Sequence, residues 1–176
     1  GTTVASYTVA ITLDDAEQHE LEVRAVIPVS GTTDLTVTSP DAGYGSSWIS
    51  VEACYDSAGK DVRIEQLNNR TWRVSPSSAG DVIVEYRART DIPSSMAAGT
   101  YLTYLSGSCG LLYGGAVFLR PSSEGSVTIN VIMPAGWSLI TDETWSPLNS
   151  TAFTVGTGDL ELFAPGNWSV YEGTFG

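Results

Sequence analysis

The single histidine, His19, is the first place to look for catalytic chemistry, because imidazole is a common protein base and zinc ligand. It begins the run His19-Glu20-Leu21-Glu22-Val23. A zinc-peptidase helix needs a second histidine four residues on, so that both imidazoles lie on one helix face. Val23 occupies that position, and the segment alternates like a strand. We therefore expect His19 to be a structural or surface residue at the entrance of a strand.

No other spacing supports nucleophilic or phosphate-binding chemistry. The chain has no G-x-S-x-G elbow and no phosphate-binding G-x-x-x-x-G-K-[ST] loop, and its only lysine, Lys60, falls in an expected hairpin turn. Cys54 and Cys109 form no C-x-x-C pair, so neither a redox motif nor a cysteine-rich zinc site is supported. The two cysteines could form one disulfide or remain two buried thiols, and the sequence leaves both options open.

Carboxylates are abundant, which makes any acidic pair weak evidence for a site. Glu20 and Glu22 share one face of an expected strand, so we expect them to be solvated. Asp14 and Asp15, followed by Glu17, could ligate calcium in a turn, but they lack the ligand ladder of an EF-hand. We therefore predict no catalytic residue, no metal site and no cofactor for this chain.

The charge of the chain excludes whole classes of partner. Eight Lys and Arg face twenty Asp and Glu, for a formal net charge of −12. Nucleic-acid binding needs clustered basic side chains, and anionic membrane surfaces attract them, so both partners are disfavoured. No apolar run approaches the ~20 residues of a membrane span. Nothing in the sequence indicates the oligomeric state. As a separate expectation, we place the protein outside the cytoplasm, either secreted or periplasmic.

The segments that would have to position any site have apolar residues at every second position, a pattern typical of half-buried strands. Expected strands cover residues 7–13, 21–27, 33–38, 48–55, 62–66, 71–74, 81–89, 111–119, 126–133, 152–155 and 160–163. Turn clusters rich in Gly and Pro separate them, and only residues 92–98 could form a helical turn. This pattern predicts an all-β fold, an antiparallel β-sandwich or a large curved, saddle-like sheet with negligible helix.

The aromatic residues divide into two groups by their strand context. Trp48, Trp72 and Trp137 lie within expected strands or at their ends, so we expect them to fill the core rather than to stack on sugars. The C-terminal region holds five aromatic residues that we predict as an interdomain contact: Trp145, Phe163, Trp168, Tyr171 and Phe175. We divide the chain into a β domain at 1–145 and a final hairpin or linker at 146–176. Since the chain opens with Gly1 rather than Met, we expect it to be part of a longer protein.

Several segments, in order, resemble the N-terminal domain of the M61 (glycyl aminopeptidase-like) metallopeptidases. Their order and spacing, over roughly residues 5 to 145, support the resemblance more than any single motif. The matching segments are Tyr7-Thr-Val-Ala-Ile11 followed by Asp15, His19 and Val23; Val51-Glu-Ala-Cys-Tyr-Asp-Ser-Ala-Gly-Lys60; Thr71-Trp-Arg-Val74; Val82-Ile-Val-Glu-Tyr-Arg87; and Val131-Ile-Met-Pro-Ala-Gly-Trp137 with Thr141. Residues 39–44 look like a degenerate form of the family's Trp-x-Pro-Gly-x-Tyr segment, with Thr38 where the Trp would fall.

The resemblance implies a β-rich, saddle-like or sandwich domain that precedes a helical zinc-peptidase domain. The family's His-Glu-x-x-His helix and downstream Glu have no counterpart here, so no catalytic residue is carried over. We expect a non-catalytic domain that supports or gates a catalytic domain further along the same parent chain, a zinc aminopeptidase. Two alternatives stay open: a free-standing carbohydrate-binding or adhesive β-sandwich, and a small β-fold hydrolase that uses scattered carboxylates.

Overall fold

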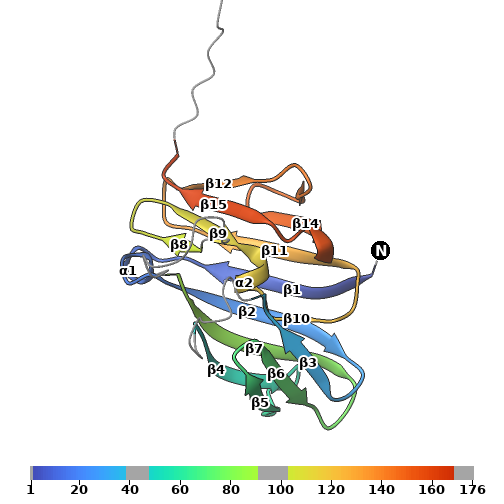
Figure 1. Ribbon diagram of the computed structural model, residues 1–176. Helices are drawn as coiled ribbons and strands as arrows, with labels where there is room; N and C mark the ends of the chain where they lie inside the picture. The colour runs from blue at the N-terminus through green and yellow to red at the C-terminus, as the bar shows by residue number, and fades with distance from the viewer. Residues whose placement is uncertain (1, 39–47, 91–102, 169–176) are drawn as a thin grey trace, which may run out of the picture.

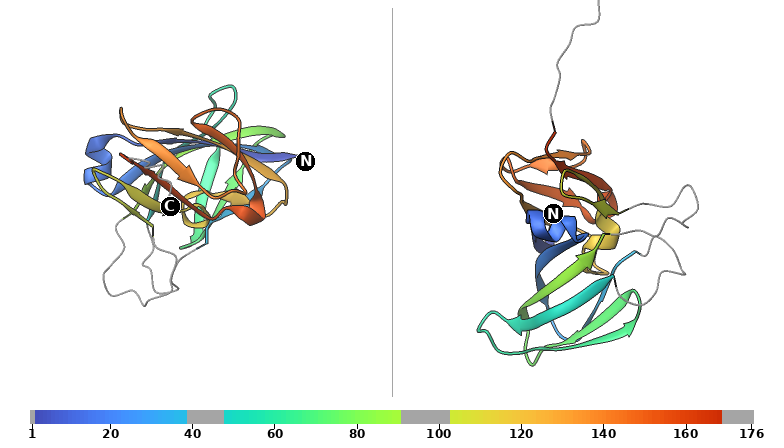
Figure 2. Two further views of the ribbon diagram at one scale, coloured as in Figure 1. Left: turned by 90° about the horizontal axis from the view of Figure 1, so that it is seen from above. Right: turned by 90° about the vertical axis from the view of Figure 1, so that its left-hand side faces the viewer.

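The computed structural model describes residues 2–38, 48–90 and 103–168. Within these ranges the chain is mostly β, with strands arranged in three sheets (Figures 1 and 2). The expected all-β class is confirmed. The degenerate Pro-Gly-Tyr segment, the expected helical turn at 92–98, and Tyr171 and Phe175 lie outside the described residues. No helix in the described ranges is long and apolar enough to cross a membrane.

The large sheet has seven strands, and their alternating sequences bury one face and leave the other polar. Its strand order is β13 (Ser146–Pro147), β14 (Ala152–Gly156), β11 (Ser126–Ile132), β1 (Thr3–Ala10), β2 (Glu20–Val29), β7 (Gly80–Arg89) and β4 (Ile49–Asp56). Every neighbouring pair is antiparallel except β1 and β11, which run parallel. The sheet is therefore mixed rather than purely antiparallel, because the chain passes through strands of both smaller sheets between β1 and β11.

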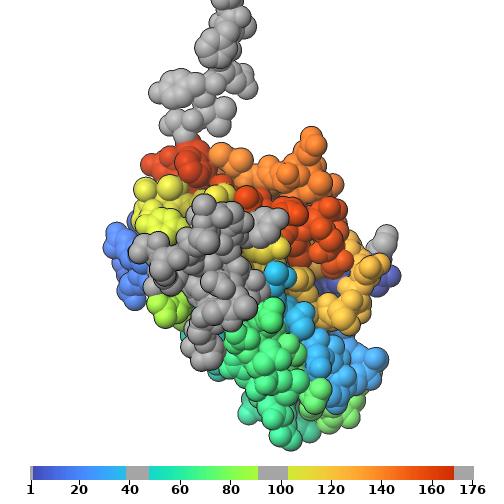
Figure 3. Space-filling model, viewed as in Figure 1, coloured from blue at the N-terminus to red at the C-terminus, as the bar shows by residue number. Residues whose placement is uncertain are grey.

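Two four-stranded sheets complete the fold. The β6 sheet has the order β10 (Arg120–Pro121), β3 (Thr33–Thr36), β6 (Thr71–Ser75) and β5 (Arg63–Asn68). The β15 sheet has the order β12 (Ser138–Thr141), β15 (Leu162–Gly166), β9 (Gly110–Tyr113) and β8 (Tyr104–Leu105). In Figure 1 the β15 sheet forms the upper end of the molecule and β3, β5 and β6 lie at the lower end; the same two ends appear in the space-filling view (Figure 3). The short helices are α1 (Leu13–Glu17), α2 (Gly114–Val117) and η1 (Thr157–Asp159).

The first expected strand is shorter than its alternation predicted. β1 ends at Ala10, and Leu13 opens helix α1 with its side chain 49% exposed instead of lying on the strand face. The physical reason is the helix cap at Thr12, whose hydroxyl accepts a hydrogen bond from the Asp15 backbone N–H at 3.1 Å. Such a cap satisfies a backbone donor that a helix start would leave unpaired, and Asp14 and Asp15 favour the positive end of the helix.

The core is built around a buried non-strand segment where the sequence predicted a continuous strand from 111 to 119. Helix α2 is fully buried. Its last two carbonyl groups, and the carbonyl of Leu119 after it, accept hydrogen bonds from side chains instead of from a neighbouring strand. The Trp48 indole donates to the Ala116 carbonyl at 2.9 Å, and the Tyr86 hydroxyl donates to the Val117 carbonyl at 2.6 Å. The Tyr7 hydroxyl donates to the Leu119 carbonyl at 2.5 Å. Burial raises the pKa of Tyr7 and of Tyr86, so both remain protonated donors.

The tryptophans predicted for the core lie there. Trp48 and Trp72 are buried, and Trp137 is partly buried against the core. Trp72 and Val74 occupy the same inward face of β6, as their spacing of two predicted. These positions argue against a sugar-stacking role for Trp48 and Trp72, because a stacking ring must be exposed.

Candidate functional site

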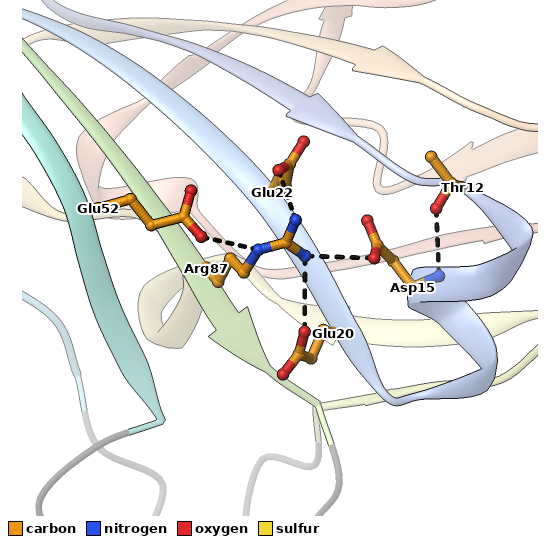
Figure 4. Close-up of polar contacts among 6 residues, drawn as sticks. All are labelled: Thr12, Asp15, Glu20, Glu22, Glu52 and Arg87. Atoms are coloured by element: carbon orange, nitrogen blue, oxygen red, sulfur yellow. Dashed lines mark hydrogen bonds and ion pairs between the residues drawn. The ribbon is translucent and has the colours of Figure 1, made fainter.

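One guanidinium gathers four carboxylates on the outer face of the large sheet (Figure 4). Arg87 lies on β7, and each of its three nitrogens has an acidic partner. Its Nη2 lies 2.7 Å from Glu22 Oε1, and its Nε lies 2.8 Å from Glu52 Oε1. Its Nη1 lies 3.2 Å from Asp15 Oδ1 and 3.5 Å from Glu20 Oε2. We call these five residues the Arg87 cluster.

Four elements of secondary structure bring the Arg87 cluster together. Glu22 of β2 lies directly opposite Arg87 of β7, and Glu20 lies on the same face two residues earlier. Helix α1 presents Asp15 from its first turn. Glu52 comes from an irregularity in β4, where the register with β7 shifts between Val51 and Ala53. A bulge of this kind adds one residue to a strand and redirects a side chain.

The electrostatics of the Arg87 cluster are those of an ion-pair network rather than a cation site. Partial burial opposes the charge of the guanidinium, but its hydrogen bonds to Asp15 and Glu52 and the nearby carboxylates outweigh that and raise the pKa of Arg87. Four carboxylates and one guanidinium leave a formal charge of about −3 on this patch. Within residues 2–38, 48–90 and 103–168, no group of three or more His, Cys, Asp or Glu residues is arranged to hold a metal ion.

Glu20 and Glu22 therefore face outward, as predicted, but they are more than solvated side chains, because both contact Arg87. The Asp15 carboxylate that was considered for calcium contacts the same guanidinium. Sequence reasoning missed Arg87 and Glu52 as members of this cluster. The alternation of 81–89 placed Arg87 on the outer face, but nothing in the sequence gave the register that aligns it with β2.

His19 has the structural role that the sequence predicted. It adopts a positive φ of 58° between α1 and β2, and its carbonyl accepts a hydrogen bond from the Thr90 N–H at 2.7 Å. Its Nδ1 lies 2.5 Å from the Leu105 carbonyl oxygen, and its ring centroid lies 5.3 Å from that of Tyr104. These contacts of His19 therefore connect β8 of the β15 sheet with the turn before β2.

A second candidate site is apolar and lies on the outer face of the β15 sheet. Four large hydrophobic side chains are exposed on it: Tyr104 (47%), Leu111 (43%), Ile140 (50%) and Leu162 (36%). Tyr104 lies opposite Leu111 in the β8–β9 pair. The intervening residues Leu112 and Phe163 point the other way and are buried. The sequence signal was available, because consecutive apolar residues such as Leu111-Leu112 give a strand two apolar faces.

The predicted aromatic contact surface is corrected by the structure at two positions. Trp145 and Phe163 are 2% and 1% exposed, with ring centroids 5.2 Å apart, so both belong to the core. Phe163 packs inward from β15, and Trp145, in the turn before β13, packs against its ring. Trp168 is half-buried, with its indole N–H donating to the Ala164 carbonyl at 2.9 Å. An interdomain contact by Trp168 stays a prediction, and Tyr171 and Phe175 lie outside the described residues.

The two cysteines are free thiols, which decides between the two options left open by the sequence. Cys54 is buried on β4, and burial, with a smaller contribution from the Asp61 charge, raises its pKa to about 11. Cys109 is half-buried beside Gly166. A thiol with a raised pKa is a poor nucleophile at neutral pH, which fits a packing role for Cys54 in the core.

Comparison with known proteins places this geometry in a family. The family model for the Peptidase M61 N-terminal domain matches residues 7–144, and no curated protein matches. An aminopeptidase N family protein from Idiomarina loihiensis has a similar fold, with a TM-score of 0.71 at 15% identity over 93% of this chain and 29% of that one. An M1 zinc metallopeptidase from Deinococcus radiodurans has a TM-score of 0.60 at 13% identity over 92% of this chain and 41% of that one.

The chain thus spans less than half the length of either solved structure, and at these identities the likeness shows the fold alone. The family model, in contrast, covers most of the sequence, from the middle of β1 to just beyond β12. Its range also contains the Arg87 cluster and the segment that Tyr7 and Tyr86 hold in the core. The chain belongs to the Peptidase M61 N-terminal domain family.

Proposed function

We propose that this chain is the non-catalytic N-terminal domain of an M61-type zinc aminopeptidase and that it supports or gates a catalytic domain of the same parent chain. The observation that carries the proposal is the family match over residues 7–144. The two solved structures with this fold are longer chains, an aminopeptidase N family protein and an M1 zinc metallopeptidase, which supports a role beside a catalytic domain. A location outside the cytoplasm remains part of this proposal.

The geometry favours a supporting scaffold over a site of its own chemistry. Tyr7, Tyr86 and Trp48 fix the segment around α2 by hydrogen bonds to its backbone carbonyls. Arg87 joins α1, β2, β4 and β7 on the opposite face of the large sheet. The first three side chains are buried, so they cannot reorganise around a substrate without loss of fold stability.

The experiment is to compare the parent protein with a version that lacks residues 1–168, using aminoacyl-p-nitroanilide hydrolysis and solubility as readouts. A supporting domain predicts that the shortened protein is insoluble or inactive. A gating domain predicts an active shortened protein whose kcat/KM rises for long peptides relative to the aminoacyl anilide. An unchanged kcat/KM for all substrates would contradict both roles.

The carbohydrate-binding alternative required an exposed platform of aromatic rings. Trp48, Trp72 and Trp145 are instead buried, each at 5% exposure or less. A glycan array with the isolated chain tests this alternative directly. Binding of a defined glycan, lost on substitution of an exposed ring such as Tyr104→Ala, would favour it over the peptidase-domain proposal.

A further inference from the structure

The outer face of the β15 sheet is continuous across all four strands. Tyr104 on β8 lies opposite Leu111 on β9, and Tyr113 lies two residues further on the same face of β9. Tyr113 is opposite Leu162 on β15. Two residues beyond Leu162, Ala164 is opposite Ile140 on β12. Directly opposed side chains in a sheet are close neighbours, so these residues form one apolar surface, which we call the β15 face.

No other described surface concentrates exposed apolar residues in this way. Four of the eight large exposed hydrophobic residues in the described ranges lie on the β15 face. The other four are scattered over separate elements: Leu13 on α1, Leu67 on β5, Ile132 on β11, and Leu148 beside β13. The four strands of the β15 sheet also contain no charged residue. A contiguous apolar face without charge marks an interaction surface, whereas single exposed apolar residues do not.

The β15 face is held in shape from behind. Leu105, Leu112 and Phe163 project from the same strands to the opposite side and are almost completely buried. The Phe163 ring lies 5.8 Å from Phe118 and 5.2 Å from Trp145. The face therefore does not need to be ordered on binding, which lowers the entropic cost of association.

The course of the chain identifies what covers the face. β15 is the last strand of the described structure, and Trp168 comes two residues after its end, with its ring against Gly166 of that strand. In the proposed parent protein the catalytic domain follows this point, so it is tethered at the edge of the β15 face. Tethering of this kind gives an effective concentration of about millimolar, enough for a modest apolar contact to be occupied.

We propose that the β15 face is the surface on which the catalytic domain of the parent chain docks, through an apolar patch of that domain. This inference rests on the proposed function and adds the contact residues Tyr104, Leu111, Ile140 and Leu162. The partner surface is apolar because the four strands offer no charge with which a charged partner could pair. Interfaces between domains of one chain commonly bury roughly 600–1,500 Å², an area that a four-stranded face can supply in large part.

The test uses the double variant Leu111→Asp with Ile140→Asp in the parent protein. The matched control is Ile132→Asp with Leu148→Asp, which changes two residues of equal or greater exposure away from the β15 face. In the isolated chain we expect the thermal midpoint of both double variants to stay within about 3 °C of wild type, because all four side chains are exposed.

In the parent protein we expect the face variant to differ from the control in two readouts. Proteolysis between the two domains should be about tenfold faster, and kcat/KM for an aminoacyl-p-nitroanilide should fall about tenfold, with the control within about twofold of wild type. Equal behaviour of the two double variants would overturn the proposal. So would a dimer of the parent protein that the face variant alone dissociates, because the occupant would then be a second copy.

The two proposals can fail separately. A wild-type parent that hydrolyses no aminoacyl substrate contradicts the proposed function, while faster junction proteolysis in the face variant still supports docking. An active parent in which the face variant and the control remain indistinguishable contradicts docking alone.

Discussion

The outer faces of the large sheet and of the β15 sheet cover parts of the same core, yet they present opposite chemistry. The large sheet presents Arg87 among four carboxylates, at distances from 2.7 to 3.5 Å. The β15 face presents Tyr104, Leu111, Ile140 and Leu162 without any charge in its four strands. The first surface is compatible with water, and the second is suited to contact with protein.

The difference shows how a sheet encodes its surroundings. Alternate residues of a strand face opposite sides, so each strand specifies two environments independently. The second half of β7, from Val84 to Arg89, alternates buried and charged residues, as in Tyr86 and Arg87. β9 instead has apolar residues on both sides, as in Leu111 and Leu112. The inner residues of both strands are buried in the core, and the two strands differ in the residues on their outer side, which are charged on this half of β7 and apolar on β9.

The largest expected effect separates the two sides of β9. Leu112→Ala should lower the free energy of unfolding of the isolated chain by about 2–5 kcal/mol, because it leaves a cavity at a fully buried position. Leu111→Ala, one residue away, should change it by about 0.5 kcal/mol or less, because that side chain is exposed. Urea denaturation measures both. Similar losses for the two variants would mean that the β15 face is already covered within this chain.

The next largest effect on stability is expected on the outer face of the large sheet, at the Arg87 cluster. Arg87→Ala should lower the free energy of unfolding by about 1–3 kcal/mol at low ionic strength, because four neighbouring carboxylates lose their shared partner. The loss should shrink at about 1 M salt, where repulsion between the carboxylates is screened. Urea denaturation at both salt concentrations is the measurement.

The control on the same face is Arg24→Ala, since Arg24 has a single acidic partner among the described residues, the half-exposed Glu85 at 3.8 Å. We expect this variant to lose about 0.5 kcal/mol or less. If Arg87→Ala lowers the free energy of unfolding no more than Arg24→Ala does, the Arg87 cluster stabilises the fold no more than an ordinary surface ion pair.

The smallest effect lies on the β6 sheet, where Asp34 of β3 is directly opposite Arg73 of β6. The Arg73 guanidinium donates to both Asp34 carboxylate oxygens, at 2.8 and 3.2 Å, and lowers the pKa of Asp34. A lowered folded-state pKa contributes stability above the unfolded-state pKa, and that contribution is lost as the pH falls through the folded-state value. The contribution is small, because both side chains are almost half exposed.

An NMR pH titration of the Asp34 carboxyl tests this prediction. Arg73→Ala should raise the pKa of Asp34 back toward its ordinary value. Arg63→Ala on the neighbouring strand should not, because Arg63 pairs with Glu65. A normal pKa for Asp34 in the wild-type chain would show that the pair does not persist in solution.

The fold class could be predicted because the alternation of apolar residues is local. Residues 21–27, 71–74 and 81–89 form strands where their period of two predicted them. The errors fall where another interaction competes with that pattern. The Thr12 cap converts the end of the first expected strand into α1. Hydrogen bonds from Trp48, Tyr86 and Tyr7 support a non-strand segment inside 111–119.

The sites were harder to predict than the fold, because they depend on which strands become neighbours. Glu22 meets Arg87 only through the register of β2 with β7, and Glu52 reaches it only through the irregularity in β4. Likewise, Trp145 and Phe163 share a region of sequence with Trp168, but sheet pairing directs the Phe163 ring into the core, where Trp145 packs against it.

The sequence alone therefore determined long strands such as those at 21–27 and 81–89, the outward sides of these strands, and the absence of a zinc-binding His-Glu-x-x-His segment from this sequence. The parallel pairing of β1 with β11, the convergence of four carboxylates on Arg87 and the continuity of the β15 face were decided by the tertiary structure. The physical reason is distance along the chain. Backbone conformation and amphipathicity are set by adjacent residues, whereas register and neighbouring strands are set by packing between segments far apart in sequence.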